Sequence, residues 1–189
     1  MASLFKEDLP DDSLQRCDLG ICVVRLPKLR EFNRLNSKVT TRSFIRTINQ
    51  AAKFLDLIIR NSESFNSLKI ADGAVSYFQT AEAAIALGEA VLANSWINSA
   101  LADYQGRNLV IGVGCSELKF MPVTNRYYGL EQDLLMDISA LLTKSSGSTF
   151  FITEQAYGAL AEGYRRLCRR QMLMRHGRKV NIYQKKVGG

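Results

Sequence analysis

The chain has 189 residues, of which 47% are hydrophobic and 23% are charged, as in a soluble globular domain large enough for a full hydrophobic core. The formal net charge is +7. No apolar run approaches the ~20 residues of a membrane span, and the N-terminus MASLFKEDLPDDS has no apolar signal-peptide core. We therefore expect no membrane span and a cytoplasmic protein.

The cysteines do not form a metal-binding pattern. The four of them lack a Cys-x-x-Cys pair, and the chain has a single histidine, so a Cys/His zinc site is not expected. We interpret them as reduced, mostly buried thiols: Cys17, Cys22, Cys115 and Cys168.

The first half of the chain predicts a strand, a helix, a hairpin and a second helix. The strand is CDLGICVVRL (17–26), and apolar residues at steps of three and four predict a helix over 40–60. In SLKIADGAVSYF (67–78), an Asp-Gly pair is typical of a two-residue hairpin turn with positive φ. An alanine-rich helix is predicted over 80–104.

The hairpin has two distinct faces. Pairing across the turn places one set of side chains on the first face: Leu68, Ile70, Val75 and Tyr77. The opposite face carries Lys69, Ala71, Ala74 and Ser76. The carboxylate of Asp72 stands at the turn, where it serves either the backbone conformation or a function of its own.

The second half of the chain continues this alternation. Strands are predicted at 108–115, 148–153 and 180–187, and helices at 130–143 and 154–170. The order indicates an α+β fold with a ferredoxin-like βαββαβ core and a C-terminal αβαβ extension, and we expect the helices on one face of the sheet. With no repeat or linker, residues 1–189 are predicted to form one domain, with its core at about 17–187 and an acidic tail at 1–16.

Charge is unevenly distributed. From Arg165 to the C-terminus there are nine basic residues and no acidic one: Arg165, Arg166, Arg169, Arg170, Arg175, Arg178, Lys179, Lys185 and Lys186. Such an end either forms a solvated face or binds nucleic acid or another polyanion.

Four segments, in the correct order, resemble the class III nucleotide cyclase homology domain. They are REFNRL (30–35), LKIADGAVSYF around Asp72, VIGVGCSEL at the central strand, and GSTFFITEQAYGAL (147–160). The resemblance covers about 17–187. Diguanylate cyclases share the core topology, but their Gly-Gly-Asp/Glu-Glu-Phe turn is absent.

The resemblance implies a dimer with sites between two chains. One chain supplies two aspartates that hold two divalent metals against the triphosphate, and the other supplies an asparagine and an arginine. Asp72 falls on the second metal aspartate. The first falls on Lys28, whose ammonium would repel a metal and can pair with Asp72 instead, and the purine-reading position falls on Leu68.

The other half of the implied site departs from the family in the same way. In RYYGLEQDLLMD (126–137), the purine-contacting aspartate falls on Arg126, the asparagine on Asp133 and the arginine on Asp137. The phosphate-contacting lysine falls at about His176. Two carboxylates would thus face a triphosphate where a cation is required, unless they are only the solvated face of a helix.

The sequence therefore predicts a degenerate cyclase-like domain with no catalytic residues. It would act as a regulatory or scaffolding module. Its partner would be a second copy of the chain in a homodimer, a related cyclase-like domain, or another protein. No cofactor is expected, and Asp72 is the one candidate for weak Mg²⁺ binding. Two alternatives stay open: an active nucleotide cyclase, and a basic module that binds nucleic acid or another polyanion.

Overall fold

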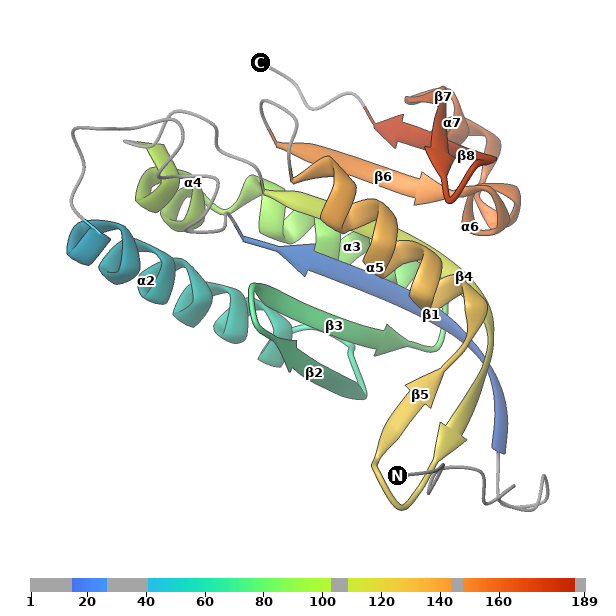
Figure 1. The fold of residues 1–189 in the computed structure, drawn as a ribbon, viewed down its shortest axis with the longest axis horizontal. Coiled ribbons are helices and arrows are strands. Elements are labelled where there is room, and N and C mark those ends of the chain that lie inside the picture. Colours follow the sequence, from blue (N-terminus) through green and yellow to red (C-terminus); the bar gives the residue numbers. More distant parts are fainter. Residues whose placement is uncertain (1–14, 27–40, 103–108, 144–147, 186–189) are drawn as a thin grey trace, which may run out of the picture.

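The computed structural model describes residues 15–26, 41–102, 109–143 and 148–185. The strands of these segments form one sheet (Figure 1). The strands are β1 (Gln15–Arg25), β2 (Asn66–Ile70), β3 (Gly73–Phe78), β4 (Val110–Met121), β5 (Arg126–Tyr128), β6 (Thr149–Thr153), β7 (Cys168–Arg175) and β8 (Arg178–Lys185). The helices are α2 (Thr41–Arg60), α3 (Ala81–Ala93), α4 (Ser95–Ala102), α5 (Leu130–Leu142), α6 (Glu154–Ala159) and α7 (Glu162–Arg165).

The strand order confirms the predicted α+β fold and its ferredoxin-like core. The order is β2-β3-β1-β4-β6-β8-β7, with β5 paired to β4. Each neighbouring pair in the run β2-β3-β1-β4 is antiparallel, whereas β6 lies parallel to β4. The C-terminal extension is richer in strands than the predicted αβαβ, because β5 and β7 add to it.

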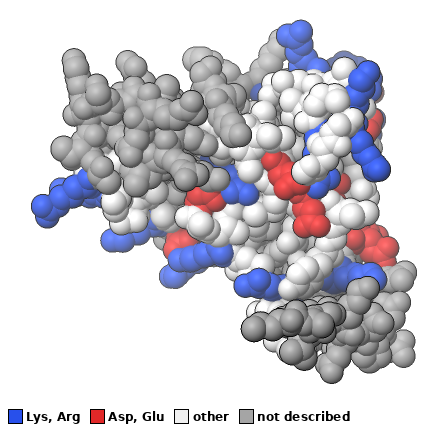
Figure 2. Space-filling view, in the orientation of Figure 1, with Lys and Arg blue, Asp and Glu red and all other residues white. Residues whose placement is uncertain are grey.

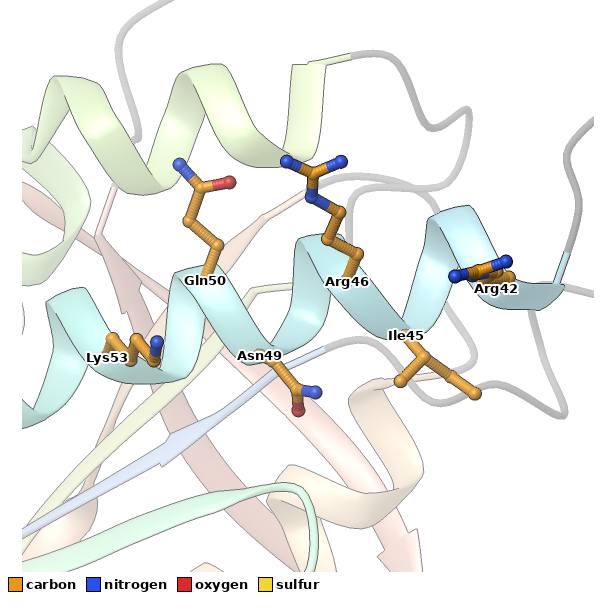
Figure 3. A pocket seen from close by; sticks show the side chains of 6 residues that line it. All are labelled: Arg42, Ile45, Arg46, Asn49, Gln50 and Lys53. Carbon is orange, nitrogen blue, oxygen red and sulfur yellow. The ribbon is translucent and has the colours of Figure 1, made fainter.

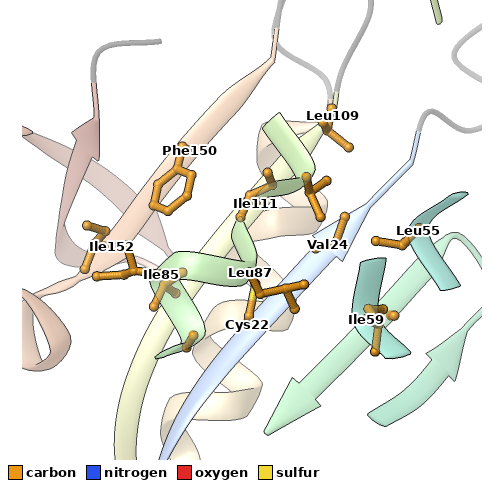
Figure 4. Packing of buried hydrophobic residues seen from close by; sticks show 14 of the residues in the cluster. Cys22, Val24, Leu55, Ile59, Ile85, Leu87, Leu109, Ile111, Phe150 and Ile152 are labelled. Carbon is orange, nitrogen blue, oxygen red and sulfur yellow. The ribbon is translucent and has the colours of Figure 1, made fainter. Parts of the chain in front are cut away.

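Helices cover both faces of the sheet, so the expectation of helices on one face is wrong. On one face, Cys22 and Val24 of β1 pack in a cluster with residues of α2, α3 and β6 (Figure 4). On the other face, Ile21 and Val23 pack with Leu135 of α5. The cause is the composition of β1, whose residues 19–24 alternate between the two faces and are all buried, so each face needs a cover.

The β2–β3 hairpin has the predicted faces but a different turn. Leu68, Ile70, Val75 and Tyr77 all belong to the cluster under α5. Ile70 pairs with Gly73, so the two central turn residues are Ala71 and Asp72 rather than Asp72 and Gly73. Within the described ranges, the non-glycine residues with positive φ are at 125 and 176, so Asp72 does not use this backbone conformation.

Gly73 is instead required by the close approach of β1. It pairs with Arg25, and a Cβ placed on Gly73 would lie 1.9 Å from the carbonyl oxygen of Val24. Its φ of 159° is also one that residues with a side chain rarely adopt. The glycine lets the turn that carries Asp72 lie directly against the end of β1.

Two predicted helices are shorter than expected. The helix predicted over 80–104 divides at Asn94, which has extended backbone and accepts a hydrogen bond from the Ile97 amide as α4 begins. The helix predicted over 154–170 divides at Leu160 and Ala161, which are also extended. Residues 168–175 then form β7, where ladder pairing to β8 outweighs the helical preference of Arg, Gln, Met and Leu.

Of the three described cysteines, one is fully buried and two are half-buried, so the expectation of mostly buried thiols is met only in part. Cys22 is buried, and burial raises the pKa of its thiol to about 12, whereas Cys115 and Cys168 are half-buried. These three cysteines are free thiols. Among the helices seen here, none combines the length and apolar character needed to span a membrane.

Replacement of Gly73 by alanine should destabilise the fold by about 1–3 kcal/mol or more, because the new methyl group would overlap the β1 backbone. The matched control is Gly158→Ala in α6, where a Cβ meets nothing within 4 Å and alanine favours the helix. Urea denaturation measures both variants. A Gly73→Ala variant as stable as Gly158→Ala would contradict this account of the turn.

Candidate functional site

Asp72, the predicted metal ligand, is bound by an arginine. Nη1 of Arg25 donates hydrogen bonds to both carboxylate oxygens of Asp72, at 2.6 and 2.9 Å. The two side chains are only 8% and 11% exposed. The carboxylate thus serves a buried ion pair between β1 and the β2–β3 turn, which answers whether it is present for the backbone alone.

The same guanidinium also anchors α5. Nε of Arg25 donates to the hydroxyl of Ser139 at 2.7 Å, and Nη2 donates to the carbonyl of Met136 at 3.2 Å. The Ser139 hydroxyl in turn donates to the Met136 carbonyl. Arg25 therefore joins β1, the β2–β3 turn and the helix that carries Asp133 and Asp137.

The backbone places Arg25 beside Asp72 through the register of two strands. Arg25 pairs with Gly73, and the amide of the next residue, Leu26, donates to the carbonyl of Asp72 at 2.7 Å. Sequence reasoning missed this residue. The available signal was a single arginine directly after the apolar run ICVV, since a charge at the end of a buried strand needs a partner.

Two other predicted positions of this half have different outcomes. Leu68 is half-buried in β2, pairs with Val75 and packs against the cluster under α5, so its side chain contributes to the core. Lys28 lies outside the described residues. Arg25, three residues earlier, supplies a partner for Asp72, and the predicted pairing of Asp72 with Lys28 stays a prediction.

On α5, Asp137 is held by the C-terminal hairpin. Nη2 and Nε of Arg175 donate to one oxygen of Asp137, at 2.6 and 2.9 Å, and Nε2 of His176 lies 3.5 Å from it. The hydrogen-bonded Arg175 lowers the pKa of Asp137 below its ordinary value. The structure thus brings together two predicted residues, Asp137 and His176, and adds Arg175.

The remaining predicted positions lie at the surface. Asp133 is exposed on the first turn of α5, and Arg126 is exposed on β5, where it pairs with Met121. His176 forms the β7–β8 turn with Gly177, and both have positive φ (46° and 75°). This is the two-residue turn geometry that matches the twist of a hairpin.

A buried carboxyl that the sequence did not indicate lies near the start of α5. Glu131 is 9% exposed, packs over Gly114 and accepts a hydrogen bond from the Thr153 hydroxyl. Burial raises its pKa above the ordinary value. With Lys179 and Asn181 it lines a cavity of about 440 Å³ between α5, β6 and β8.

A larger hollow of about 640 Å³ lies along α2, but one helix supplies every described residue that lines it (Figure 3). Arg46 and Gln50 point to one side of the helix, and Ile45 and Asn49 to the other. This is the outer surface of a cationic helix, and no second described element closes it into a site. In the described segments there is also no cluster of three or more His, Cys, Asp or Glu residues suited to a metal ion.

Breaking the Arg25–Asp72 pair from either side should destabilise the protein by about 3–5 kcal/mol, because each single change leaves a buried charge without its partner. The variants are Arg25→Met and Asp72→Asn, measured by urea denaturation. The double variant should lose less stability than the sum of the two, as expected for groups in contact.

The matched control for this cycle is Asp56→Asn. Asp56 pairs with Lys69 next to the same hairpin, but that lysine side chain is 74% exposed, so about 1 kcal/mol or less is expected. Equal losses for Asp72→Asn and Asp56→Asn would show that the buried pair does not constrain the fold.

The described architecture is similar to that of nucleotide cyclases. The crystal structure of the guanylyl cyclase Cya2 has a TM-score of 0.64 at 15% identity, over 92% of this chain and 93% of that chain. The catalytic core of a rhodopsin-guanylyl cyclase with converted specificity, in complex with ATPαS, has a TM-score of 0.64 at 13% identity, over 92% and 98%. An adenylate cyclase structure from Trypanosoma brucei has a TM-score of 0.62 at 14% identity, over 89% and 87%.

Neither protein-family models nor curated protein sequences give a match to this chain. At identities this low the structural likeness establishes the fold, and the order of four short motifs had indicated the same fold. The chain therefore has the architecture of a class III nucleotide cyclase catalytic domain.

Proposed function

We propose that this chain is a catalytically inactive, cyclase-like domain that acts through protein–protein contacts as a regulatory or scaffolding module. The observation that carries the proposal is the pairing of Asp72 with Arg25. Both oxygens of the carboxylate that would hold a metal accept hydrogen bonds from a buried guanidinium.

Metal chemistry does not fit these residues. Two-metal transfer of a nucleotidyl group needs carboxylate oxygens that are open to the metals. A guanidinium supplies positive charge but has no orbital to accept an oxygen lone pair, so it cannot replace a metal as a Lewis acid. A divalent ion at Asp72 would also have to displace Arg25, which is held by Ser139 and Met136 as well.

The phosphate side of the implied site is also unfavourable. Asp133 and Asp137 would direct negative charge at a triphosphate, and Arg175, the nearest cation to Asp137, is already paired with it. Transition-state stabilisation of phosphoryl transfer requires cations at such positions. The charges of this chain therefore oppose both halves of the reaction.

An active nucleotide cyclase is the second candidate function, and the fold shared with guanylyl and adenylate cyclase structures favours it. Activity would require the Arg25–Asp72 pair to open, or a partner chain to supply the missing groups. The two candidate functions predict different results in an assay of cyclic-nucleotide formation.

The purified chain should form no cyclic nucleotide from ATP or GTP with Mg²⁺ or Mn²⁺, because Arg25 occupies Asp72 and carboxylates face the phosphates. An active class III cyclase domain serves as the positive control, and product is measured by chromatography. Cyclic product that disappears in a folded Asp72→Asn variant would establish the active cyclase instead.

We also propose that the chain dimerises, and exposed apolar side chains on one projecting arm support this. The β4–β5 hairpin and the start of β1 extend together beyond the other strands (Figure 1). Val123, at the tip of the β4–β5 hairpin, is 89% exposed, and Leu130, at its base, is 88% exposed. Tyr128 lies between them in the sequence and is 42% exposed. Such side chains gathered on one arm are typical of an interaction surface, and a symmetric dimer needs only one self-complementary patch.

Sedimentation equilibrium at micromolar concentration should therefore detect a dimer, and a Leu130→Lys variant should shift it towards monomer by about tenfold in the dissociation constant. The control is Leu57→Lys, a change of the same kind at an exposed leucine on α2. A monomer at high micromolar concentration would exclude the homodimer, and mixing with a related cyclase-like domain would then test the heterodimer.

A further inference from the structure

The sheet ends at β7, whose backbone is paired on one side only in the described structure. All eight of its residues pair with β8, from Cys168 opposite Lys185 to Arg175 opposite Arg178. In an antiparallel ladder, alternate residues direct their N–H and C=O groups away from the partner strand. Half of the β7 residues therefore present these groups at the end of the sheet, where no other described strand lies.

This edge is strongly basic. Arg169 and Arg170 are exposed on β7, Arg178 and Lys179 are exposed on β8, and no acidic residue follows Glu162 in the chain. Figure 2 shows Lys and Arg side chains at the upper right, the corner that β7 and β8 occupy in Figure 1. Like charges on neighbouring strands are destabilising, so this edge disfavours a second copy of itself and favours an acidic strand.

The same edge also offers apolar contacts at the spacing of a strand. Met172 and Met174 are 57% and 59% exposed and lie two residues apart, so they share a face with Arg170. Leu173 lies on the opposite face and packs in the cluster under α5. Methionine side chains adapt to varied apolar partners, which suits contact with alternate residues of an added strand.

We propose that β7 is a docking edge for an extended acidic segment of a partner protein, which joins the sheet as a further antiparallel or parallel strand. Backbone hydrogen bonds would supply affinity, and Arg169, Arg170 and the two methionines would supply selectivity. This inference does not depend on the loss of catalysis, because the edge is the same whether the cleft is active or not.

A nucleic acid fits this surface less well than a peptide. Binding of single strands relies on open aromatic rings for base stacking. The aromatic ring of this hairpin, Tyr183, is already stacked on Tyr157 with ring centroids 3.6 Å apart. Exposed methionines contact apolar side chains, but they have no charge and no hydrogen-bond donor with which to bind a phosphate backbone.

The experiment titrates the full chain with a fluorescent peptide as long as β7 that alternates glutamate with valine, and measures anisotropy. Three competitors are used: the same peptide with every amide N-methylated, an oligoglutamate of equal charge, and a single-stranded RNA of equal charge. N-methylation removes the backbone donors that pair with a strand edge but keeps the charge. The dissociation constant of this competitor should therefore be at least about tenfold higher than that of the unmodified peptide.

Variants of the chain locate the site. The double change Arg169→Glu with Arg170→Glu should weaken the alternating peptide by about tenfold, since two attractive charges become repulsive. The matched control, Arg46→Glu with Lys53→Glu, makes the same change of net charge on exposed residues of α2 and should leave binding unaltered. Replacement of Met172 and Met174 by serine should weaken the peptide but not the RNA.

Loss of binding on N-methylation together with loss in the β7 variants alone would support the proposal. Equal binding of the N-methylated peptide, or tighter binding of the RNA with the same sensitivity to Arg169 and Arg170, would show a simple polyanion site and overturn it. Absence of binding by the alternating peptide would also overturn it. Circular dichroism of each variant confirms that the chain is folded.

Discussion

The guanidinium of Arg25 joins three parts of the fold through one buried charge. It binds Asp72 at the β2–β3 turn, Ser139 on α5 and the carbonyl of Met136, and it is itself 7% exposed. Removing one member of a buried ion pair costs far more than removing both, so neither Arg25 nor Asp72 can change alone without loss of stability. The carboxylate of Asp72 thereby helps to hold β1, the β2–β3 turn and α5 together.

A second carboxylate, that of Asp137, takes part in a similar but weaker ion pair. Asp137 pairs with Arg175, but its side chain is 44% exposed, so solvent screens this pair far more than the first. The lowered pKa of Asp137 means that its pairing stabilises the fold at neutral pH, and that this contribution is lost as the pH falls through its folded pKa. Arginines of the same chain thus neutralise one carboxylate in each half of the implied site. Any nucleotide would have to compete with these internal partners for its own contacts.

Local sequence patterns were sufficient for most of the fold but not for its pairings. The period-two pattern around Asp72 gave the correct faces of the hairpin, because burial on one face dictates which side chains point inward. The turn itself was placed one residue too late, since the need for glycine arises from contact with Val24, which is far away in the sequence. Arg25 escaped notice for the same reason: its partner is defined by the register of β1 on β3, not by a motif. The expectation at Lys28 stays untested, because that residue lies outside the described part of the chain.

The segment 168–175 shows how one change of secondary structure alters a functional interpretation. As part of a helix, its arginines would be spread around a cylinder, and a solvated face would be a sufficient explanation. As an edge strand, β7 lines up Arg170 with the exposed Met172 and Met174 on one face and places Arg169 on the other face, beside unpaired backbone groups. The opposite end of the same strand carries Arg175, which holds Asp137 on α5. A strand added along β7 would therefore contact the hairpin that also binds α5 through Arg175. Because α5 in turn accepts the hydrogen bonds of Arg25, docking at this edge would be connected to the Arg25–Asp72 pair by a continuous chain of contacts.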